Sequence, residues 1–299
     1  MKRFGIIFSG ILTAALLVLA LNCRSVFTKT NVLRMATKPM TEQYILGYMT
    51  KALIEQETNL TVEITEGVGG GTLNIQPAME SGKFDFYPEY TGTGWNAVLK
   101  NSRLYNESMF PELQTGYEKL NMIWIGMLGF NNTFGIAVTR ETARQYNLKT
   151  YSDLAAVAGK LTFGAEYDFF ERGDGYNALR DVYGLKFKKT MDLDIGLKYD
   201  AINQLKIDAM NIFTTDGQLS VSDIVVLKDD KNLYPSYMCG FVVRKETLQA
   251  HPELGKTLDR MSGLITDAEM ANMNYQVESG GKNPEEVAVA YLRAKGLLN

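Results

Sequence analysis

Residues 84–95 read FDFYPEYTGTGW. This segment combines two Phe, two Tyr and one Trp with two carboxylates, a proline and two glycines. It is too aromatic for an ordinary surface loop and too interrupted for one long strand, so we predict a short strand that ends in a turn. Phe84 and Phe86 are expected to pack in the core, whereas Pro88 and Gly92 are expected to shape the turn. Rings beside a Thr-Gly-Thr turn at a strand end favour a ligand site.

The rest of the chain alternates short apolar runs with helical patterns. Runs typical of strands cover residues 32–36, 60–65, 84–90, 122–130, 134–139, 160–165, 222–227 and 239–244. Helical patterns cover residues 41–57, 73–82, 141–147, 152–158, 173–183, 200–206, 246–263, 267–279 and 284–296. Thr41 is a candidate N-cap, and GVGGGT (67–72) predicts a turn with positive φ. The alternation favours an α/β protein with largely parallel sheets.

Length and composition exclude several classes of protein. The 299 residues, 45% of them hydrophobic, suffice for one large or two medium domains. A net charge of −3 with scattered Lys and Arg argues against a nucleic-acid partner. Two cysteines cannot form a disulfide framework, and a single His disfavours metal sites and His-based catalysis. We therefore expect no metal and no cofactor.

The first 22 residues are predicted to be a secretory signal peptide, followed by a tether over residues 23–31. Lys2 and Arg3 precede an uncharged apolar run at residues 5–21. Cys23 follows this run and is a candidate for lipidation of a bacterial lipoprotein, although Asn22 departs from the small residue usual before such a Cys. A plain signal peptide and a retained membrane anchor are the alternatives. Each places the remaining chain outside the cytoplasm.

Two motifs that suggest enzymatic chemistry are weak. GVGGGT lacks the Lys-Ser or Lys-Thr of a phosphate-binding loop and does not complete a dinucleotide fingerprint. Asp85 and Glu89 could form an acid–base pair as in a glycoside hydrolase, but a structural role is at least as well supported. His251 lies in a helix-start context, which disfavours a Ser-His-Asp triad.

Four aromatic residues beside small or polar neighbours form a better candidate site. Tyr90, Phe134, Phe213 and Tyr237 are each expected at a strand end or turn. A single such ring is most often part of the core. Several at strand ends can instead converge on a cleft, and ring faces bind quaternary ammonium, a cation that cannot donate hydrogen bonds.

At this point the sequence resembles a known family. The segments that carry the resemblance are ATKPMTEQ (36–43), FDFYPEYTGTG (84–94), FNNTFGIAV (130–138), FFERGDGY (169–176), IFTTDGQL (212–219) and LYPSYMCGFVVR (233–244). Together they resemble the substrate-binding proteins of ABC importers for glycine betaine, choline and related quaternary ammonium compounds, including an ergothioneine-binding branch. The resemblance covers residues 32–297, nearly the whole chain after the predicted tether.

The resemblance implies a two-lobed periplasmic-binding-protein fold of type II, with a mixed sheet flanked by helices in each lobe. Lobe 1 would comprise residues 32–131 and 237–299, and lobe 2 residues 132–236. The chain would cross between lobes near Asn131 and Tyr234, and ligand would lie in the cleft between them. An ABC permease is the implied partner, and we expect a monomer that is not an enzyme.

The resemblance also assigns roles to residues. Tyr90, Phe134, Phe213 and Tyr237 match the four aromatic residues that surround trimethylammonium in the family, where Tyr is usual at all four. Lys38, Arg172 and Thr93 match the residues that bind the carboxylate of betaines. Asn132 matches a position that faces the cation in the family. Gln43 is a candidate for a further polar contact, and Gly70 and Gly71 are the candidates in the glycine loop.

The identity of the ligand stays open among several trimethylated compounds. Retaining both Lys38 and Arg172 favours a betaine-type zwitterion over choline, which has no carboxylate. The three glycines of GVGGGT and two Phe in place of Tyr would enlarge or depolarise the pocket. A larger zwitterion, with the histidine betaine ergothioneine tested first, is therefore expected, and glycine betaine, carnitine and proline betaine are alternatives. A ligand-sensing domain and an extracytoplasmic enzyme remain rival functions.

Overall fold

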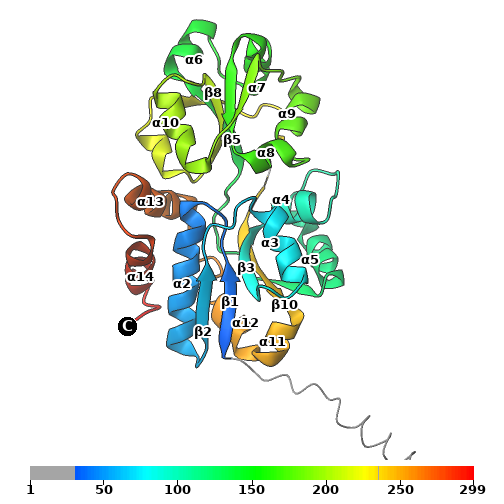
Figure 1. Cartoon of the computed structure of the whole chain (residues 1–299), viewed down its shortest axis with the longest axis vertical. Coiled ribbons are helices and arrows are strands. Elements are labelled where there is room, and N and C mark those ends of the chain that lie inside the picture. The colour runs from blue at the N-terminus through cyan, green and yellow to red at the C-terminus, as the bar shows by residue number, and fades with distance from the viewer. Residues whose placement is uncertain (1–30, 235) are drawn as a thin grey trace, which may run out of the picture. The chain divides into compact units, whose positions relative to one another are not determined.

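The computed structural model describes residues 31–234 and 236–299. The predicted signal peptide, Cys23, the tether up to residue 30 and Pro235 lie outside the described residues. Within the described ranges no helix is both long and apolar enough to cross a membrane. The part that follows the tether, Val32–Asn299, forms one compact unit with two β-sheets (Figure 1).

The first sheet has the strand order β2-β1-β3-β10-β4. Its strands are β1 (Val32–Ala36), β2 (Thr61–Thr65), β3 (Phe86–Tyr90), β4 (Met122–Ile125) and β10 (Cys239–Arg244). The helices that accompany these strands in the chain are α2 (Thr41–Glu57), α3 (Thr72–Glu80), α4 (Thr91–Thr93), α5 (Phe110–Lys119), α11 (Lys245–Ala250), α12 (Pro252–Asp259), α13 (Asp267–Glu278) and α14 (Pro284–Ala294).

The second sheet has the strand order β7-β6-β8-β5-β9. Its strands are β5 (Phe134–Thr139), β6 (Thr162–Ala165), β7 (Lys189–Asp192), β8 (Ala209–Phe213) and β9 (Ile224–Val226). Its helices are α6 (Arg140–Tyr146), α7 (Tyr151–Ala155), α8 (Tyr167–Glu171), α9 (Tyr176–Tyr183) and α10 (Lys198–Asn203). Short π- and 3-10 helices lie at η1 (Gly94–Val98), η2 (Glu107–Met109), η3 (Ala158–Lys160), η4 (Ile195–Leu197) and η5 (Gly217–Ser220).

Both sheets are mixed, as the family resemblance implied. Each keeps two parallel pairings, β1–β2 and β1–β3 in the first and β6–β7 and β6–β8 in the second, so the expectation of largely parallel sheets is met in part. In the first sheet β10 runs antiparallel to β3 and β4, and in the second β5 runs antiparallel to β8 and β9. The strands of the first sheet come from residues 32–125 and 239–244, and those of the second from 134–226. This membership fits the two predicted lobes, whose boundaries at 131/132 and 236/237 stay predictions.

Most predicted elements are confirmed, with differences at their ends. The N-cap of α2 is Met40, and Thr41 is the first helical residue rather than the cap. The single helix expected over 246–263 is divided into α11 and α12 because Pro252, which cannot donate a backbone hydrogen bond, starts a new helix. The strand expected over 122–130 ends at Ile125, and Gly126 follows it with φ of 65°.

Pro88 lies inside β3 and not in a turn as expected. Its register partner in β10 is Phe241, whereas the pairing of β3 with β1 is limited to Met35 with Phe86. Pro88 therefore lies beyond the paired part of β1, where its missing N–H breaks no ladder bond. Phe84 and Phe86 are buried as predicted.

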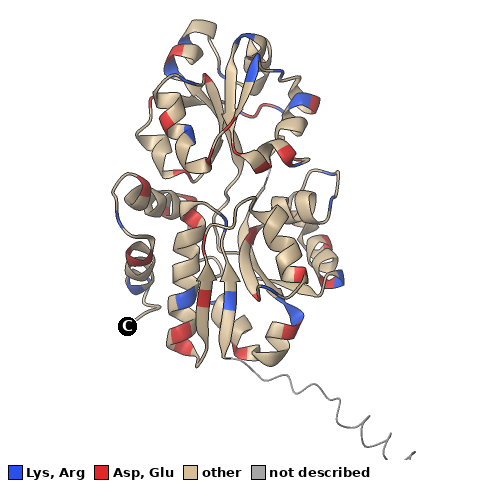
Figure 2. Cartoon of the chain, viewed as in Figure 1, with Lys and Arg blue, Asp and Glu red and all other residues tan. Residues whose placement is uncertain are grey.

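Charged residues are distributed over both sheets and their helices. Figure 2 shows Lys and Arg interspersed with Asp and Glu, without a stripe of one sign on the described part of the chain. Cys239 is a free thiol buried in β10.

Candidate functional site

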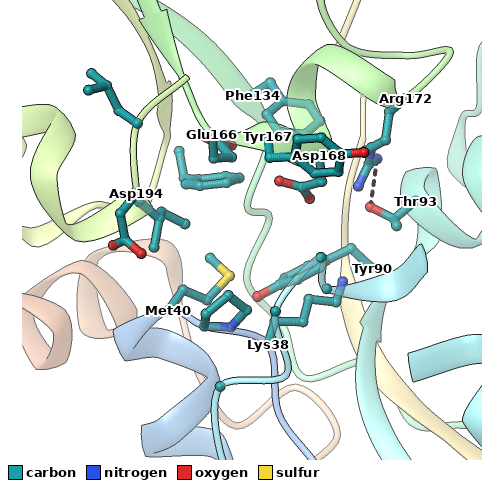
Figure 3. Close-up of a pocket in the computed structure, with 18 of the residues that line it drawn as sticks. Lys38, Met40, Tyr90, Thr93, Phe134, Glu166, Tyr167, Asp168, Arg172 and Asp194 are labelled. Carbon is teal, nitrogen blue, oxygen red and sulfur yellow. Dashed lines mark hydrogen bonds between the residues drawn. The ribbon is translucent and has the colours of Figure 1, made fainter. Parts of the chain in front are cut away.

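A cavity of about 440 Å³ is lined by residues from both sheets. Every predicted ligand-binding residue except Gln43 lies in its wall: Lys38, Gly70, Gly71, Tyr90, Thr93, Asn132, Phe134, Arg172, Phe213 and Tyr237. Figure 3 shows Lys38, Met40 and Tyr90 on one side and Phe134, Glu166, Tyr167 and Asp168 on the other. The structure thus collects residues that are far apart in the sequence into one site.

Three of the four predicted rings form a cluster centred on Phe134. Phe134 in β5 and Phe213 in β8 are register partners across an antiparallel ladder, so both side chains project from the same face of the sheet. Their ring centroids lie 5.4 Å apart, and Tyr237 lies 5.5 Å from Phe134 in an edge arrangement. Tyr90 ends β3 in the first sheet and faces the cavity from there.

Gly92 is needed for the position of Tyr237. A Cβ on Gly92 would lie 2.7 Å from the Tyr237 ring and 2.7 Å from the backbone oxygen of Ser236. Such contacts are too close for any side chain, so only glycine lets the Tyr237 ring approach the turn. Gly92 lies in the short helix α4 rather than in the expected turn, and it permits close packing there.

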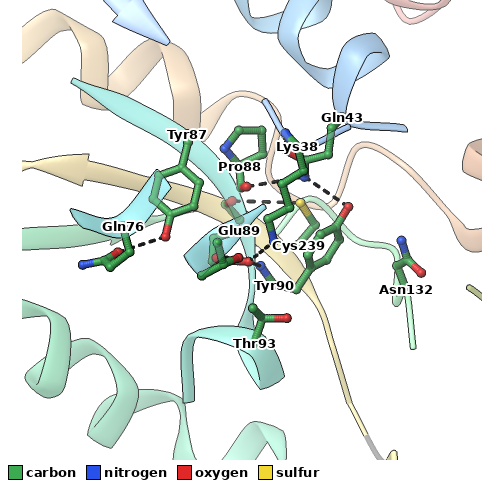
Figure 4. Close-up of polar contacts among 12 residues, drawn as sticks. Lys38, Gln43, Gln76, Tyr87, Pro88, Glu89, Tyr90, Thr93, Asn132 and Cys239 are labelled. Atoms are coloured by element: carbon green, nitrogen blue, oxygen red, sulfur yellow. Dashed lines mark hydrogen bonds and ion pairs between the residues drawn. The ribbon is translucent and has the colours of Figure 1, made fainter. Parts of the chain in front are cut away.

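Lys38 reaches under the Tyr90 ring and forms a buried ion pair with Glu89 (Figure 4). Its Nζ lies 4.6 Å from the centroid of the Tyr90 ring. Glu89 also accepts a hydrogen bond of 2.6 Å from Thr72 and one of 2.7 Å from the backbone N–H of Tyr90. Glu89 is therefore fully engaged in holding Lys38 and the strand end.

Arg172 is buried and already paired with a carboxylate. Its guanidinium donates to both oxygens of Asp174, at 2.8 and 2.6 Å, and to the Thr93 hydroxyl at 3.0 Å. Tyr237 donates its hydroxyl to the same Asp174 at 2.8 Å. Arg172 thus forms a local pair with Asp174, and this network fixes Arg172, Thr93 and Tyr237 relative to one another.

Glu42 is a buried carboxylate directly behind the cavity wall. One of its oxygens, Oε1, accepts hydrogen bonds from the Tyr90 hydroxyl and, at 2.8 Å, from Nδ2 of Asn132. The other accepts a bond of 2.6 Å from the Thr215 hydroxyl. Burial raises the pKa of Glu42, and its hydrogen bonds from Thr215, Tyr90 and Asn132 oppose this shift. Sequence inspection missed this residue because Glu42 looks like an ordinary first-turn acid of a helix.

Gln43 lies behind Tyr90 and is absent from the cavity wall. Its Nε2 donates to the Tyr90 hydroxyl at 3.1 Å, and its Oε1 accepts from the backbone N–H of Lys38 at 3.3 Å. The geometry therefore gives Gln43 a supporting place rather than the predicted direct ligand contact.

The glycine loop and several acids complete the wall. Gly67, Gly70 and Gly71 have φ of 63°, 73° and 52°, which confirms the predicted positive-φ turn. The side of the second sheet adds residues that sequence inspection missed: Glu166, Tyr167, Asp168, Asp192, Leu193, Asp194 and Ile195. These residues end or follow the parallel strands β6 and β7, and ligand sites of α/β proteins lie at the carboxyl ends of such strands. Because the sequence analysis did not predict β7, it missed the residues at that end.

Asp85 and Glu89 do not form an acid–base pair. Asp85 accepts from the backbone N–H and the guanidinium of Arg34, at 2.8 to 3.1 Å, and is absent from the cavity wall. His251 is buried at the start of α12, beside Glu253. Among the described residues no group of three or more His, Cys, Asp and Glu side chains is placed to hold a metal ion.

Comparisons with known proteins agree with this geometry. Residues 31–294 match the model of the substrate-binding domain of the ABC-type glycine betaine transport system. The chain belongs to this family, which confirms the resemblance read from the sequence, and it is a substrate-binding protein of an ABC transporter. Proteins of this class work outside the cytoplasm, and the relatives found here are transport proteins rather than enzymes.

Two curated relatives and one solved structure are particularly similar. The ergothioneine transport permease/ergothioneine binding protein EgtU of Helicobacter pylori is 44% identical over 88% of this chain. The match covers 47% of EgtU, so this chain spans about half of that relative. The carnitine transport binding protein OpuCC of Listeria monocytogenes is 33% identical, over 98% of this chain and 96% of OpuCC.

The solved structure of a glycine betaine/carnitine/choline ABC transporter chain supports the fold. It is 31% identical, covers 89% of this chain and all of its own length, and superposes with a TM-score of 0.70. The two-lobed α/β periplasmic-binding-protein fold is therefore confirmed.

Proposed function

We propose that this protein captures a trimethylammonium zwitterion of the betaine type for import, with ergothioneine as the preferred ligand. The observation that carries the proposal is the convergence of Tyr90, Phe134, Phe213 and Tyr237 on one cavity that Lys38, Arg172 and Thr93 also line. Glycine betaine is the second candidate, and carnitine and choline are the alternatives in the same class.

The aromatic end of the cavity suits a cation that has no N–H group. A quaternary ammonium cannot donate a hydrogen bond, so ring faces are its natural partners. A desolvated cation–π contact is worth up to about 2 kcal/mol, and four of them approach the roughly 8 kcal/mol of micromolar binding. Phe134 and Phe213 supply ring faces without the hydroxyls usual in the family, which makes their part of the cavity less polar.

Cationic residues beside the rings suit a carboxylate: Lys38 lies 4.6 Å from the ring centroid of Tyr90, and Arg172 lies 5.1 Å from that of Phe134. Lys38, Arg172 and the Thr93 hydroxyl line the cavity. Both cations already have carboxylate partners, so a ligand carboxylate would join these pairs rather than meet isolated charges. Thr93, which accepts from Arg172, is placed to rotate its hydroxyl and donate to the ligand.

Four observations support a ligand larger than glycine betaine. The cavity volume of about 440 Å³ lies in the range of sites for drug-sized molecules. The Gly70–Gly71 loop removes side chains from its wall. The relative that shares 44% identity is named as an ergothioneine-binding protein. Asp168 and Asp194 add acceptors that the ring N–H groups of ergothioneine would use.

Isothermal titration calorimetry with ergothioneine, glycine betaine, carnitine and choline tests the proposal. We expect ergothioneine to bind most tightly and choline to bind more weakly than the zwitterions. If glycine betaine bound tightly and ergothioneine gave no heat, glycine betaine would replace ergothioneine as the preferred ligand. Heat from none of the four would refute the proposed ligand class.

The cellular setting is part of the proposal. We propose that Cys23 is lipidated and anchors the protein to the outer face of the cell membrane, where it acts as a monomer with an ABC permease and without catalysis or nucleic-acid binding. Mass spectrometry of the N-terminal peptide tests the anchor, since an unmodified peptide containing Cys23 would exclude it.

An adjacent permease gene and ATPase gene would separate import from a purely sensory role, and turnover of bound ligand would reveal an enzyme.

A further inference from the structure

We propose that Glu42, which does not line the cavity, is the residue that makes this site select a trimethylammonium group over an uncharged group of the same shape. This inference rests on the proposed function, because it assumes that the aromatic end holds a trimethylammonium group. Glu42 would position Tyr90 and Asn132, and it would supply negative charge from behind these residues of the cavity wall.

Burial raises the pKa of Glu42, whereas its hydrogen bonds and its place at a helix N-terminus favour the ionised form that the proposal requires. Its side chain is 1% exposed and lies in the first turn of α2, a helix of 17 residues whose N-terminal dipole stabilises negative charge. Tyr90, Asn132 and Thr215 donate to its two oxygens. Three donors on one carboxylate are the usual way in which a buried negative charge is kept.

The charge of Glu42 has no cationic partner in direct contact. Among residues 31–234 and 236–299, no Lys, Arg or His nitrogen lies within ion-pair distance of Glu42, whereas Glu89, Glu166 and Asp174 each have one. A buried charge without a counter-ion is costly, so a cation in the adjacent cavity would be stabilised by it. Two of the three donors, Tyr90 and Asn132, themselves line that cavity.

Glu42 also fixes which end of Asn132 is left for the ligand. A carboxylate accepts hydrogen bonds, so it binds the amide nitrogen and leaves the amide oxygen. That oxygen is buried and has no hydrogen-bond partner in the structure, although Asn132 is in the cavity wall. Glu42 therefore holds the amide of Asn132 as an oriented dipole, with its nitrogen toward the carboxylate and its buried oxygen without a hydrogen-bond partner.

The same arrangement acts on Tyr90. When a phenol donates its proton to a carboxylate, the oxygen becomes more electron-rich, and the negative face of the ring binds a cation more strongly. A carboxylate placed directly against trimethylammonium would instead lose its hydrogen bonds, because that cation has none to offer. The charge of Glu42 lies behind the cavity wall, so this carboxylate keeps its hydrogen bonds when a ligand is bound.

The test is the selectivity of Glu42→Gln for glycine betaine over 3,3-dimethylbutanoate, in which carbon replaces the nitrogen and the positive charge is absent. Glutamine keeps the size of Glu42 and can still accept from Tyr90 and Asn132. Titration calorimetry, with displacement for weak ligands, would measure both compounds and ergothioneine. We expect the variant to bind glycine betaine and ergothioneine about tenfold more weakly and the carbon isostere, whose tert-butyl end is uncharged, within twofold of the unmodified protein.

The control is Asp85→Asn, which removes a buried carboxylate that lies outside the cavity wall and should leave all three affinities within twofold. If Glu42→Gln weakens glycine betaine and the isostere equally, Glu42 only supports the shape of the site and the inference is wrong. Unchanged affinity for the cations would also overturn it. If the unmodified protein binds no trimethylammonium compound, the proposed function fails and the role of Glu42 falls with it.

Discussion

Phe134 and Phe213 are register partners in the β5–β8 ladder, and their ring centroids lie 5.4 Å apart. Because paired residues of antiparallel strands project from the same face, this register fixes two rings in the cavity wall without any loop. A rigid pair of ring faces is a better cation site than rings on mobile segments, because little conformational entropy is lost when ligand binds.

Phe213→Leu tests the ring face apart from apolar volume. Leucine fills similar space but has no π-system, so we expect trimethylammonium ligands to bind about 1 kcal/mol more weakly. Calorimetry would measure the affinity. Phe213→Tyr is the matched control, since it keeps the ring and should retain most of the affinity. Equal affinity for the Leu variant and the unmodified protein would remove Phe213 from the cation site.

Tyr237→Ala should weaken binding by at least about 1–2 kcal/mol, because it removes a second ring face. Tyr237→Phe removes only the hydroxyl that donates to Asp174, so its loss should be smaller, under about 1 kcal/mol. Titration of both variants, with thermal unfolding to verify folding, separates ring from hydroxyl. A folded Ala variant with undiminished affinity would exclude Tyr237 from the site.

Gly92→Ala should impair binding through Tyr237. The new Cβ would lie 2.7 Å from the Tyr237 ring, so the ring must move, and we expect affinity to fall at least as far as in Tyr237→Ala. Gly173→Ala is the control, because a Cβ there meets no atom within 4 Å. If Gly92→Ala binds normally, the position of Tyr237 does not depend on this close approach.

Thr93→Val tests whether the Thr93 hydroxyl contacts the carboxylate of the ligand. Valine has the shape of threonine without the hydroxyl, and Arg172 keeps both hydrogen bonds to Asp174. We expect binding of carboxylated ligands to weaken by about 1 kcal/mol and binding of choline to change by less than half of that. Calorimetry with glycine betaine and choline measures both. An equal loss for the two ligands would argue against a carboxylate contact at Thr93.

Stability should fall with rising pH because of Glu278 at the end of α13. Burial, followed by the charge of Asp216, raises the pKa of Glu278 from 4.5 to about 7, against hydrogen bonds from Thr41 and from the backbone of Gly217 and Gln218. Between these two values the folded protein retains a proton that the unfolded chain has released. The free energy of unfolding therefore decreases from pH 4.5 to pH 7, by up to about 3 kcal/mol.

Denaturant titrations across this pH range would measure the effect, and Glu278→Gln should flatten it. Glutamine keeps the length of the side chain and carries no charge. A variant whose stability depends on pH as steeply as that of the unmodified protein would show that other groups, such as Glu42 and Asp216, whose pKa values are also raised by burial, dominate the dependence.

The sequence by itself determined the family, the two mixed sheets and nearly every candidate of the aromatic and carboxylate ends. These features are local: α2 and β10 are read from apolar periodicity, and YPEYTGT and TTDG are contiguous motifs. The division at Pro252 could have been read the same way, since proline ends or starts a helix wherever it stands.

Only the tertiary structure decided which charges face one another. Arg172 pairs with Asp174 and not with Glu166, which is held by Lys198, and Glu42 gathers donors from three separate segments. Arg172 and Asp174 are close in the chain, but the partners of Glu42 lie up to 173 residues from it, so no local pattern records them. Their pairing is set by how strand ends from two sheets meet around one cavity, where burial makes each unpaired charge costly.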